Sequence, residues 1–206
     1  MNRKSFDSLL SWIGALLVVV FLAAGFLLNW GYSFANNTVH DQLAQQQIFF
    51  PKAGSPGLDA KTYPMLQKYG EMQLTTGQQA ADYANFFIGE HVKFVNAGKT
   101  YAATSGESRA AAGAAQAANT AAAATPADTT LAAAATTANA NAAALAGKTD
   151  TLFKGETLRG MLLNAYAFWQ LGQIARLAAF GAFIAGFLML VLTLVGFTRV
   201  RKGVTA

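Results

Sequence analysis

The strongest constraint on this chain is an uncharged apolar stretch near its C-terminal end. Residues 177–198 carry no charge and consist mostly of Leu, Ile, Val, Phe, Ala and Gly. About 20 such residues in a helix cross the hydrocarbon core of a bilayer. Because the backbone in lipid must satisfy its own hydrogen bonds, a helix is the conformation expected there. The stretch therefore predicts a transmembrane helix over 177–198.

A second apolar stretch lies near the N-terminal end and predicts another transmembrane helix, over 9–30. A cleavable signal peptide, with a cleavage site around Ala35, is the alternative. The apolar core is longer than the ~7–15 residues of a signal peptide, so we expect a retained span. Trp12 and Trp30 lie near its two ends, where aromatic side chains favour the membrane interface.

Basic residues flank both spans and predict their orientation. Arg3 and Lys4 precede the first span, and Arg199, Arg201 and Lys202 follow the second. Since Lys and Arg accumulate on the cytoplasmic side, we expect 1–8 and 199–206 in the cytoplasm and 31–176 outside the plasma membrane. These flanks also account for much of the net charge of +5. The expected partners are thus membrane lipid and membrane proteins, and not nucleic acid.

The composition and the histidines argue against an enzyme. The chain has no cysteine, which excludes disulfides, thiol catalysis and thiolate metal sites. A non-haem iron site needs two histidines and a carboxylate. The two histidines are His40 and His91, and Glu90 points about 100° away from its neighbour His91 on a helix. We therefore expect no catalytic residue, cofactor or metal, and a metal-dependent enzyme is the weakest alternative.

Both spans are expected to continue as helices beyond the membrane. No proline precedes Pro51 and none follows Pro126. The first helix is expected to end at Phe49-Phe50-Pro51, and the second to run from Glu156 to Thr198. Side chains recur at three- and four-residue spacing in both extensions, which is typical of helices. They are Ala35, Val39, Leu43, Gln46 and Phe50 in the first and Leu158, Leu162, Ala165, Trp169 and Gly172 in the second.

The segment between the spans is also expected to be helical. A helix is predicted over about 77–97, with Thr76 as its cap and Gly98 as its stop. Residues 109–146 are more than half alanine, the residue with the highest helix propensity. A capping Thr125 and Pro126 at the next position predict two Ala-rich helices joined by a turn, and a flexible tether is the alternative. The predicted fold class is an all-α membrane protein: two antiparallel transmembrane helices extended into an extracytoplasmic helical bundle, with an Ala-rich helical hairpin.

Small residues four positions apart predict close packing of the second span. Such spacing lets helix backbones approach each other in lipid. The residues are Ala178, Gly181, Ala182, Ala185 and Gly186. Their partner is either the first span, through Gly14, Ala24 and Gly25, or another protein.

The run TLFKGETLRGMLLNAYAF at 151–168 resembles a run found in a family of uncharacterised two-pass membrane proteins from actinobacteria. The stretches at 49–51 and 75–77 are similar as well. The resemblance implies two spans but brings no established activity. Some members carry the label of an aromatic ring-opening dioxygenase, and the histidine argument above speaks against that chemistry here. The run is expected to place Lys154, Glu156 and Arg159 at the outer tip of the second helix, forming with His91 a docking surface.

The function predicted from these features is that of a non-enzymatic accessory or structural subunit of a plasma-membrane complex, respiratory or transport in kind. It would bind other membrane-protein subunits through its outer helical domain and its spans. The alternative is a homo-oligomeric channel or transporter component. Two spans cannot enclose a pore alone, and neither carries a charge at the membrane centre, so the sequence offers no selectivity filter.

Overall fold

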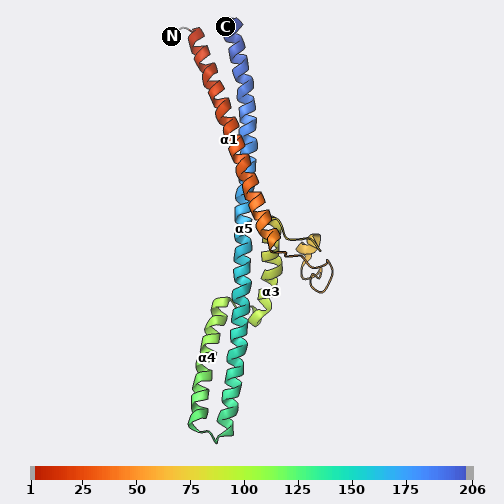
Figure 1. Cartoon of the computed structure of the whole chain (residues 1–206), viewed down its shortest axis with the longest axis vertical. Helices are drawn as coiled ribbons and strands as arrows, with labels where there is room; N and C mark the ends of the chain where they lie inside the picture. The colour runs from red at the N-terminus through yellow and green to blue at the C-terminus, as the bar shows by residue number, and fades with distance from the viewer. Residues whose placement is uncertain (1–2, 203–206) are drawn as a thin grey trace. The chain divides into compact units, whose positions relative to one another are not determined.

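A computed structural model describes residues 3–202, and in this range the chain is helical without strands (Figure 1). The predicted all-α class is confirmed, with 84% of the residues in helices. The elements are α1 (Arg3–Gln45), η1 (Pro64–Tyr69), α2 (Gly77–Asp82), η2 (Tyr83–Ile88), α3 (Gly89–Phe94), η3 (Val95–Gly98), α4 (Tyr101–Ala124) and α5 (Thr129–Lys202). Two compact units form: unit 1 is Met1–Gln46, Thr75–Gly77 and Tyr166–Ala206, and unit 2 is Gln47–Leu74 and Gln78–Ala165.

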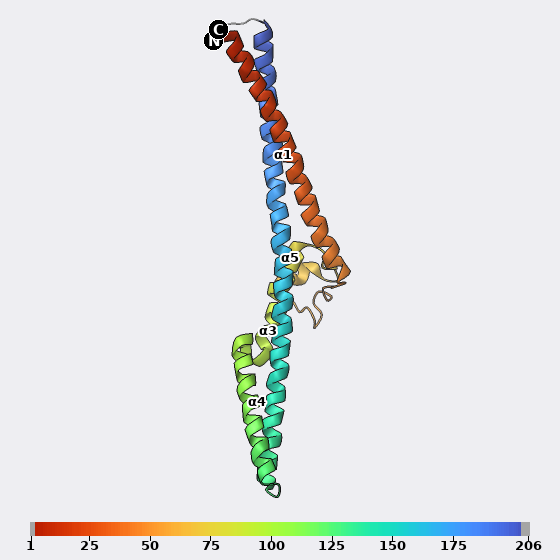
Figure 2. The same cartoon turned by 60° about the vertical axis from the view of Figure 1, so that its left-hand side comes forward.

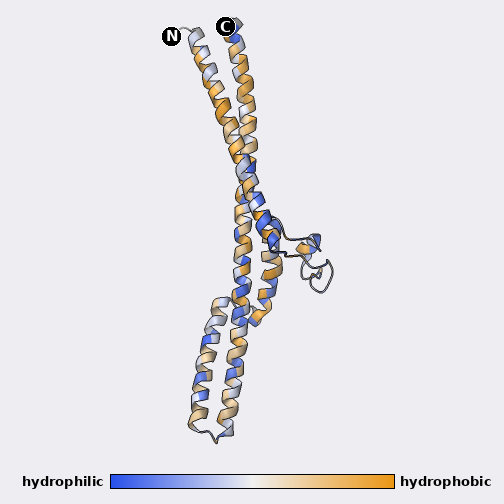
Figure 3. Ribbon diagram, in the orientation of Figure 1, coloured by the Kyte–Doolittle hydropathy of each residue, from blue (hydrophilic) through white to orange (hydrophobic). Residues whose placement is uncertain are grey.

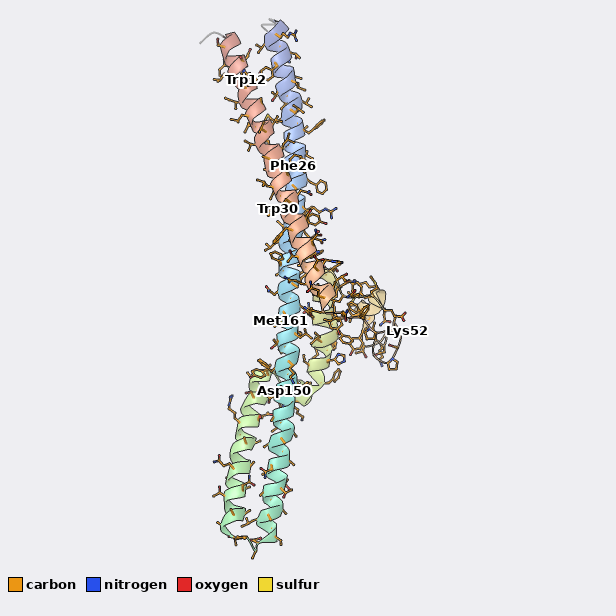
Figure 4. The ribbon with its side chains drawn as sticks, viewed as in Figure 1. Trp12, Phe26, Trp30, Lys52, Asp150 and Met161 are labelled. Carbon is orange, nitrogen blue, oxygen red and sulfur yellow. The ribbon has the colours of Figure 1, made fainter. Side chains whose placement is uncertain are left out.

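Two helices are long and apolar enough to cross a membrane, over Ser5–Gln45 and Thr129–Arg201. The expected spans 9–30 and 177–198 lie inside them, where the ribbon is mostly orange (Figure 3). Trp12, Phe26 and Trp30 are all exposed side chains of α1 (Figure 4). Apolar side chains on the outside of a helix pair are the pattern that lipid, rather than water, accommodates.

In unit 1, α1 packs against the C-terminal part of α5 in antiparallel orientation (Figures 1 and 2). Three ring pairs show the direction. Ring centroids are 5.5 Å apart for Trp12 and Phe197 and 5.3 Å apart for Phe26 and Phe183. The third pair, Phe34 and Phe168, is 6.4 Å apart. As the residue number rises in α1, the partner's number falls in α5, which confirms the predicted antiparallel pair.

Helix α1 ends at Gln45, so the predicted end at Phe49-Phe50-Pro51 is wrong. Gln47 adopts a positive φ of 51°, which turns the chain before any proline is reached. Phe49 then forms an antiparallel bridge with Gln73. The Phe50 amide donates to the Met72 carbonyl at 2.9 Å. The backbone groups after the turn are thus satisfied by another segment rather than by a continuing helix.

Helix α5 runs without a break over 74 residues, so the predicted start of a separate helix at Glu156 is wrong. The second Ala-rich helix and the extended helix of the second span are the same element, α5. No proline follows Pro126, and the glycines in this region are tolerated inside a helix at modest cost. Lys154, Glu156 and Arg159 therefore lie far inside the helix and not at its tip.

In unit 2, α4 and the N-terminal part of α5 form the predicted Ala-rich hairpin (Figure 1). Its contact face buries Ala111, Ala115 and Ala135. The cap of α5 is Asp128, whose Oδ1 accepts hydrogen bonds from the amides of Thr130 at 2.8 Å and Leu131 at 3.2 Å. The prediction that Thr125 caps this helix is wrong, since Thr125 instead ends α4.

The predicted helix over 77–97 is present as three consecutive segments, α2, η2 and α3, ending at Phe94. Asn96, Ala97 and Gly98 all have positive φ, so the chain leaves the helix slightly before Ala97. The middle segment η2 is a π-helix, which the residue spacing did not predict.

Candidate functional site

The π-helix η2 in unit 2 departs from regular α-helical hydrogen bonding. A π-helix bonds each amide to the carbonyl five residues earlier, and here the Gly89 amide donates to the Ala84 carbonyl. Such segments are rare and occur frequently at functional sites. Ala84 and Ile88 are buried, so η2 forms one wall of the unit's interior.

Arg159 of α5 is tied to this π-helix. Its Nε donates to the Ala84 carbonyl at 3.1 Å, and its Nη1 donates to both carboxylate oxygens of Glu156, at 3.1 and 2.9 Å. Glu156 therefore orients Arg159, and Arg159 joins α5 to η2. Of the predicted docking residues, Glu156 and Arg159 thus form hydrogen bonds within the chain.

A row of aromatic side chains runs along η2 and the loop beside it. Tyr83 stacks on Phe87 with ring centroids 4.6 Å apart, and Phe50 contacts Tyr83 edge-on at 5.2 Å. Phe50 also contacts Tyr69, whose hydroxyl donates to Asp82 at 2.7 Å. Burial raises the pKa of Tyr83, and burial together with the hydrogen bond to Asp82 raises the pKa of Tyr69. Both phenols therefore remain neutral and serve in packing.

His91 closes this row at the surface of the unit. Its ring lies 4.6 Å from the Phe87 ring and 5.9 Å from the Tyr63 ring. Its Nδ1 lies 2.8 Å from the Phe87 carbonyl oxygen, a geometry that requires the proton on Nδ1. The ring is exposed. Nε2 is consequently the nitrogen that His91 can offer to a partner.

Next to His91 lies a hollow of about 380 Å³ between α5 and the end of the π-helical segment. Most of its lining is apolar. The lining residues are Phe87, Ile88, His91, Val92, Val95, Thr151, Lys154, Gly155 and Leu158. We call this set the apolar hollow. It contains two of the four predicted docking residues, His91 and Lys154.

The hollow depends on a glycine. A Cβ on Gly155 would lie 2.6 Å from Val92 Cγ1, too close for any side chain. Lys154 is exposed and pairs with Asp150 at 2.7 Å, one turn earlier on α5. An exposed ion pair of this kind contributes little to stability. The Lys154 ammonium can therefore leave Asp150 and pair with a carboxylate of a binding partner.

Unit 2 also exposes large apolar side chains around its surface. Phe94 is 77% exposed, and Met161, labelled in Figure 4, is 66% exposed. Others of this kind are Phe49, Met65, Met72, Phe86, Phe153 and Leu158. Sequence patterning singled out His91 and the run at 154–159, which includes Leu158, but did not predict that these apolar side chains are exposed. Their exposure depends on which neighbours pack against each segment, and spacing along the chain does not give this.

The residues predicted for helix packing in unit 1 divide into two groups. Gly186 is buried, and a Cβ there would lie 3.3 Å from Phe21 Cβ. Ala182 and Ala185 are half-buried, whereas Ala178 and Gly181 are exposed on α5. The first group faces α1, and the second leaves a small-residue surface open.

The buried face of α5 in unit 1 follows a seven-residue period that the four-residue pattern missed. Its buried members are Gly172, Ala179, Gly186 and Thr193. The buried face of α1 alternates steps of three and four through Ser11, Gly14 and Val18 and includes Gly25. Seven-residue periodicity is the signature of left-handed helix pairs. The seam therefore includes Gly14 and Gly25, while Ala24 lies beside it.

Within residues 3–202 no group of three or more His, Asp or Glu side chains could hold a metal ion. Comparison with known proteins gives no match to any family, any curated protein or any solved structure.

Proposed function

We propose that the chain is a non-enzymatic accessory subunit of a plasma-membrane protein complex, anchored by its two apolar helices and bound to a partner protein through unit 2. The observation that carries this proposal is the apolar hollow with His91 and Lys154 at its edge. Basic flanks on both spans support a topology with cytoplasmic ends and an extracytoplasmic unit 2.

The hollow has the composition of a protein-binding surface. Aromatic side chains and Met are enriched at interfaces, and an apolar pocket ringed by polar groups is where binding energy concentrates. Exposed Phe94, Phe153 and Leu158 would be costly in water without a covering partner. The Lys154 ammonium favours a partner that presents a carboxylate beside an apolar anchor.

The run that resembles the actinobacterial two-pass family supports the same surface. Residues 151–168 include Thr151, Lys154, Gly155 and Leu158, all of which line the hollow. We propose that this resemblance reflects a shared docking function.

A photo-crosslinking amino acid at Leu158 tests the proposal in the native membrane. We expect a reproducible crosslink to one other membrane protein, identified by mass spectrometry after solubilisation in mild detergent. The same group at Met72, which is exposed but does not line the hollow, is the matched control and should give no such product.

Leu158→Glu should reduce co-purification of that partner by about tenfold or more, as expected for an interface anchor. Met72→Glu should leave it unchanged. Recovery of the wild-type chain only as a lone monomer would contradict the proposal. A crosslink from Leu158 to a second copy of this chain would favour the homo-oligomeric alternative instead.

A further inference from the structure

A second hollow lies in unit 1, at the end of the helix pair where the basic flanks begin. Its volume is about 580 Å³. It combines apolar, hydroxyl and charged side chains. The lining residues are Asp7, Leu10, Ser11, Ile13, Gly14, Leu17, Met189, Leu192, Thr193, Gly196 and Arg199. We call this set the boundary hollow, because it spans the expected membrane boundary at residues 9 and 198.

Two glycines place two hydroxyl groups in the boundary hollow. A Cβ on Gly14 would lie 2.5 Å from Thr193 Oγ1, and a Cβ on Gly196 would lie 2.6 Å from Ser11 Oγ. Each hydroxyl thus fits against a glycine backbone of the opposite helix. The seam is built so that polar atoms, and not methyl groups alone, occupy this end of the helix pair.

Thr193 is the unusual member of this seam. It is 6% exposed, and its Oγ1 has no hydrogen-bond partner among the residues that the structure describes. Ser11, in contrast, donates to the Asp7 carbonyl at 2.9 Å. Helical threonines elsewhere in the chain also donate to a carbonyl three or four residues earlier: Thr120, Thr136, Thr137, Thr149, Thr151 and Thr198. A buried hydroxyl without a partner is unfavourable, so Thr193 indicates a ligand that brings an acceptor.

Asp7 and Arg199 supply opposite charges at the mouth of the boundary hollow. Ser11 faces Gly196, and Gly14 faces Thr193. As the residue number rises by three in α1, the number of the facing residue falls by three in α5. This register places Asp7 and Arg199 at about the same level. Among the side chains of residues 5–201, which the structure describes, neither of them has an ion-pair partner. A ligand with both a negative and a positive group would complement them.

The depth of each group completes the pattern. At 1.5 Å per residue, Thr193 lies roughly 9 Å deeper in the helix pair than Arg199, and Ser11 roughly 6 Å deeper than Asp7. Leu17, Met189 and Leu192 provide apolar walls. From the boundary inward the order is charges, hydroxyls and apolar walls. A glycerophospholipid has the same order: a charged headgroup, ester carbonyls and acyl chains.

We propose that the boundary hollow binds one phospholipid of the phosphatidylethanolamine type. The lipid phosphate pairs with Arg199, and its primary ammonium donates a hydrogen bond to the Asp7 carboxylate. One of its ester carbonyls accepts a hydrogen bond from the Thr193 hydroxyl. Phosphatidylcholine offers no N–H donor to Asp7, and phosphatidylglycerol offers no positive charge. The proposal rests on the membrane placement of the two spans, but not on a partner at unit 2.

The test is native mass spectrometry of the full-length, delipidated protein in mild detergent. Phosphatidylethanolamine, phosphatidylcholine and phosphatidylglycerol with identical acyl chains are added at equal concentration. We expect one phosphatidylethanolamine to be retained with about a fivefold preference over each of the others, the size of one exposed ion pair. Arg199→Gln should remove the retained lipid, and Asp7→Asn should abolish the preference over phosphatidylcholine.

Thr193→Val keeps the shape of the side chain and should weaken retention about fivefold, the effect of one hydrogen bond. Arg201→Gln and Thr198→Val are the matched controls at the same boundary, since neither residue lines the hollow, and they should retain lipid like the wild type. Circular dichroism checks that every variant keeps its helix content.

Equal retention of the three lipids by the wild type and all variants would mean only general lipid contact and would overturn the proposal. A preference for phosphatidylglycerol would overturn the role of Asp7. A protein that is soluble without detergent and binds none of the lipids would overturn both this proposal and the membrane placement. A retained lipid together with a failed Leu158 crosslink would refute the docking function alone.

Discussion

The chain contains two antiparallel helix pairs that both meet through small residues but expose different kinds of side chain on their outer surfaces. In unit 1, α1 and α5 meet through Gly14, Gly25 and Gly186, and their outer side chains are Leu, Phe, Val and Trp. In unit 2, α4 and α5 meet through alanines, and their outer side chains are largely Ala, Thr, Asn and Gln. Figure 3 shows this change of colour along α5.

The difference in outer surface suggests that small residues at the contact have different roles in the two helix pairs. In lipid no hydrophobic force drives helices together, so close approach of backbones at glycine supplies the packing. In water burial is favourable, but alanine buries little area. The hairpin therefore relies on polar bonds, such as the reciprocal amide pair between Asn119 and Asn139 at 3.1 and 2.9 Å.

The largest effect is expected where the hairpin joins the core of unit 2. Leu152 is 2% exposed, among the most buried side chains of α5. Leu152→Ala should lower the free energy of unfolding of unit 2 by about 2–5 kcal/mol, because the truncation leaves a cavity. Thermal unfolding followed by circular dichroism measures this change. Met161→Ala on the same helix is the control, and an equal loss there would show that the core is not located as described.

The next effect tests the glycine seam of unit 1. A Cβ on Gly25 would lie 2.6 Å from the Phe183 ring, whereas Gly31 on the same helix has no heavy atom within 4 Å. Gly25→Leu should cost about 1–3 kcal/mol in unfolding titrations in mixed micelles, because the ring must move. Gly31→Leu is the matched control and should be neutral or slightly stabilising. A reversed order of the two variants would refute the seam.

A smaller effect tests the polar bonds of the hairpin. Asn139→Ala removes both amide hydrogen bonds to Asn119, each worth about 0.5–1.5 kcal/mol, and gains about 0.5 kcal/mol in helix propensity. Backbone hydrogen exchange in α4 should become faster. Asn141→Ala, two residues away and exposed, should slow exchange slightly or leave it unchanged. Identical behaviour of both variants would mean that alanine burial alone holds the hairpin.

The smallest effect is a pH dependence at the base of the same hairpin. The pKa of Glu107 lies below its ordinary value of 4.5, first because Lys99 donates a hydrogen bond to it and next because Asn96 does. A lowered pKa in the folded state means that the stabilisation is present above the unfolded-state value and is lost as pH falls through the folded-state value.

The protection of amides at the start of α4, measured as the exchange rate relative to the intrinsic rate at the same pH, should therefore fall on acidification in the wild type. Glu107→Gln should remove this acid dependence while keeping a hydrogen-bonding side chain. If the variant kept the same acid response, another group would be responsible for it.

The fold class could be predicted because its signals are long and redundant. The uncharged stretch at 177–198 and the alanine content of 109–146 each persist over many turns, so neighbouring positions agree. The ends of elements were less predictable. Gln47 turns the chain by its own positive φ, and no glycine or proline marks that position.

The candidate sites were only partly predictable, for a physical reason. Lys154 stands out as a charged residue in a chain with few charges, and His91 as one of two histidines, and both line the apolar hollow. Arg159, from a distant part of the sequence, donates a hydrogen bond to the Ala84 carbonyl in the π-helix at 83–88. Spacing within one helix carries no information on such a partner.

The packing face of α5 illustrates the same limit of local patterns. A four-residue spacing of small residues selected Ala178 and Gly181, which are exposed. The buried face follows a seven-residue period through Gly186 and Thr193, which is set by the matching face of α1. Two helices must be compared before either seam can be identified.

The central claim is that 9–30 and 177–198 cross one membrane with both chain ends on its cytoplasmic side. The chain has no native cysteine, so single cysteines can report on accessibility without background. Ala117→Cys lies on the exposed surface of α4, Ser5→Cys on the N-terminal flank, and Leu27→Cys at a position 69% exposed in the helix pair. In intact cells a membrane-impermeant maleimide should label Ala117→Cys alone, Ser5→Cys should react only after lysis, and Leu27→Cys should react only after denaturation. Labelling of Ser5→Cys but not Ala117→Cys in intact cells, or rapid labelling of Leu27→Cys in the native protein, would contradict the account.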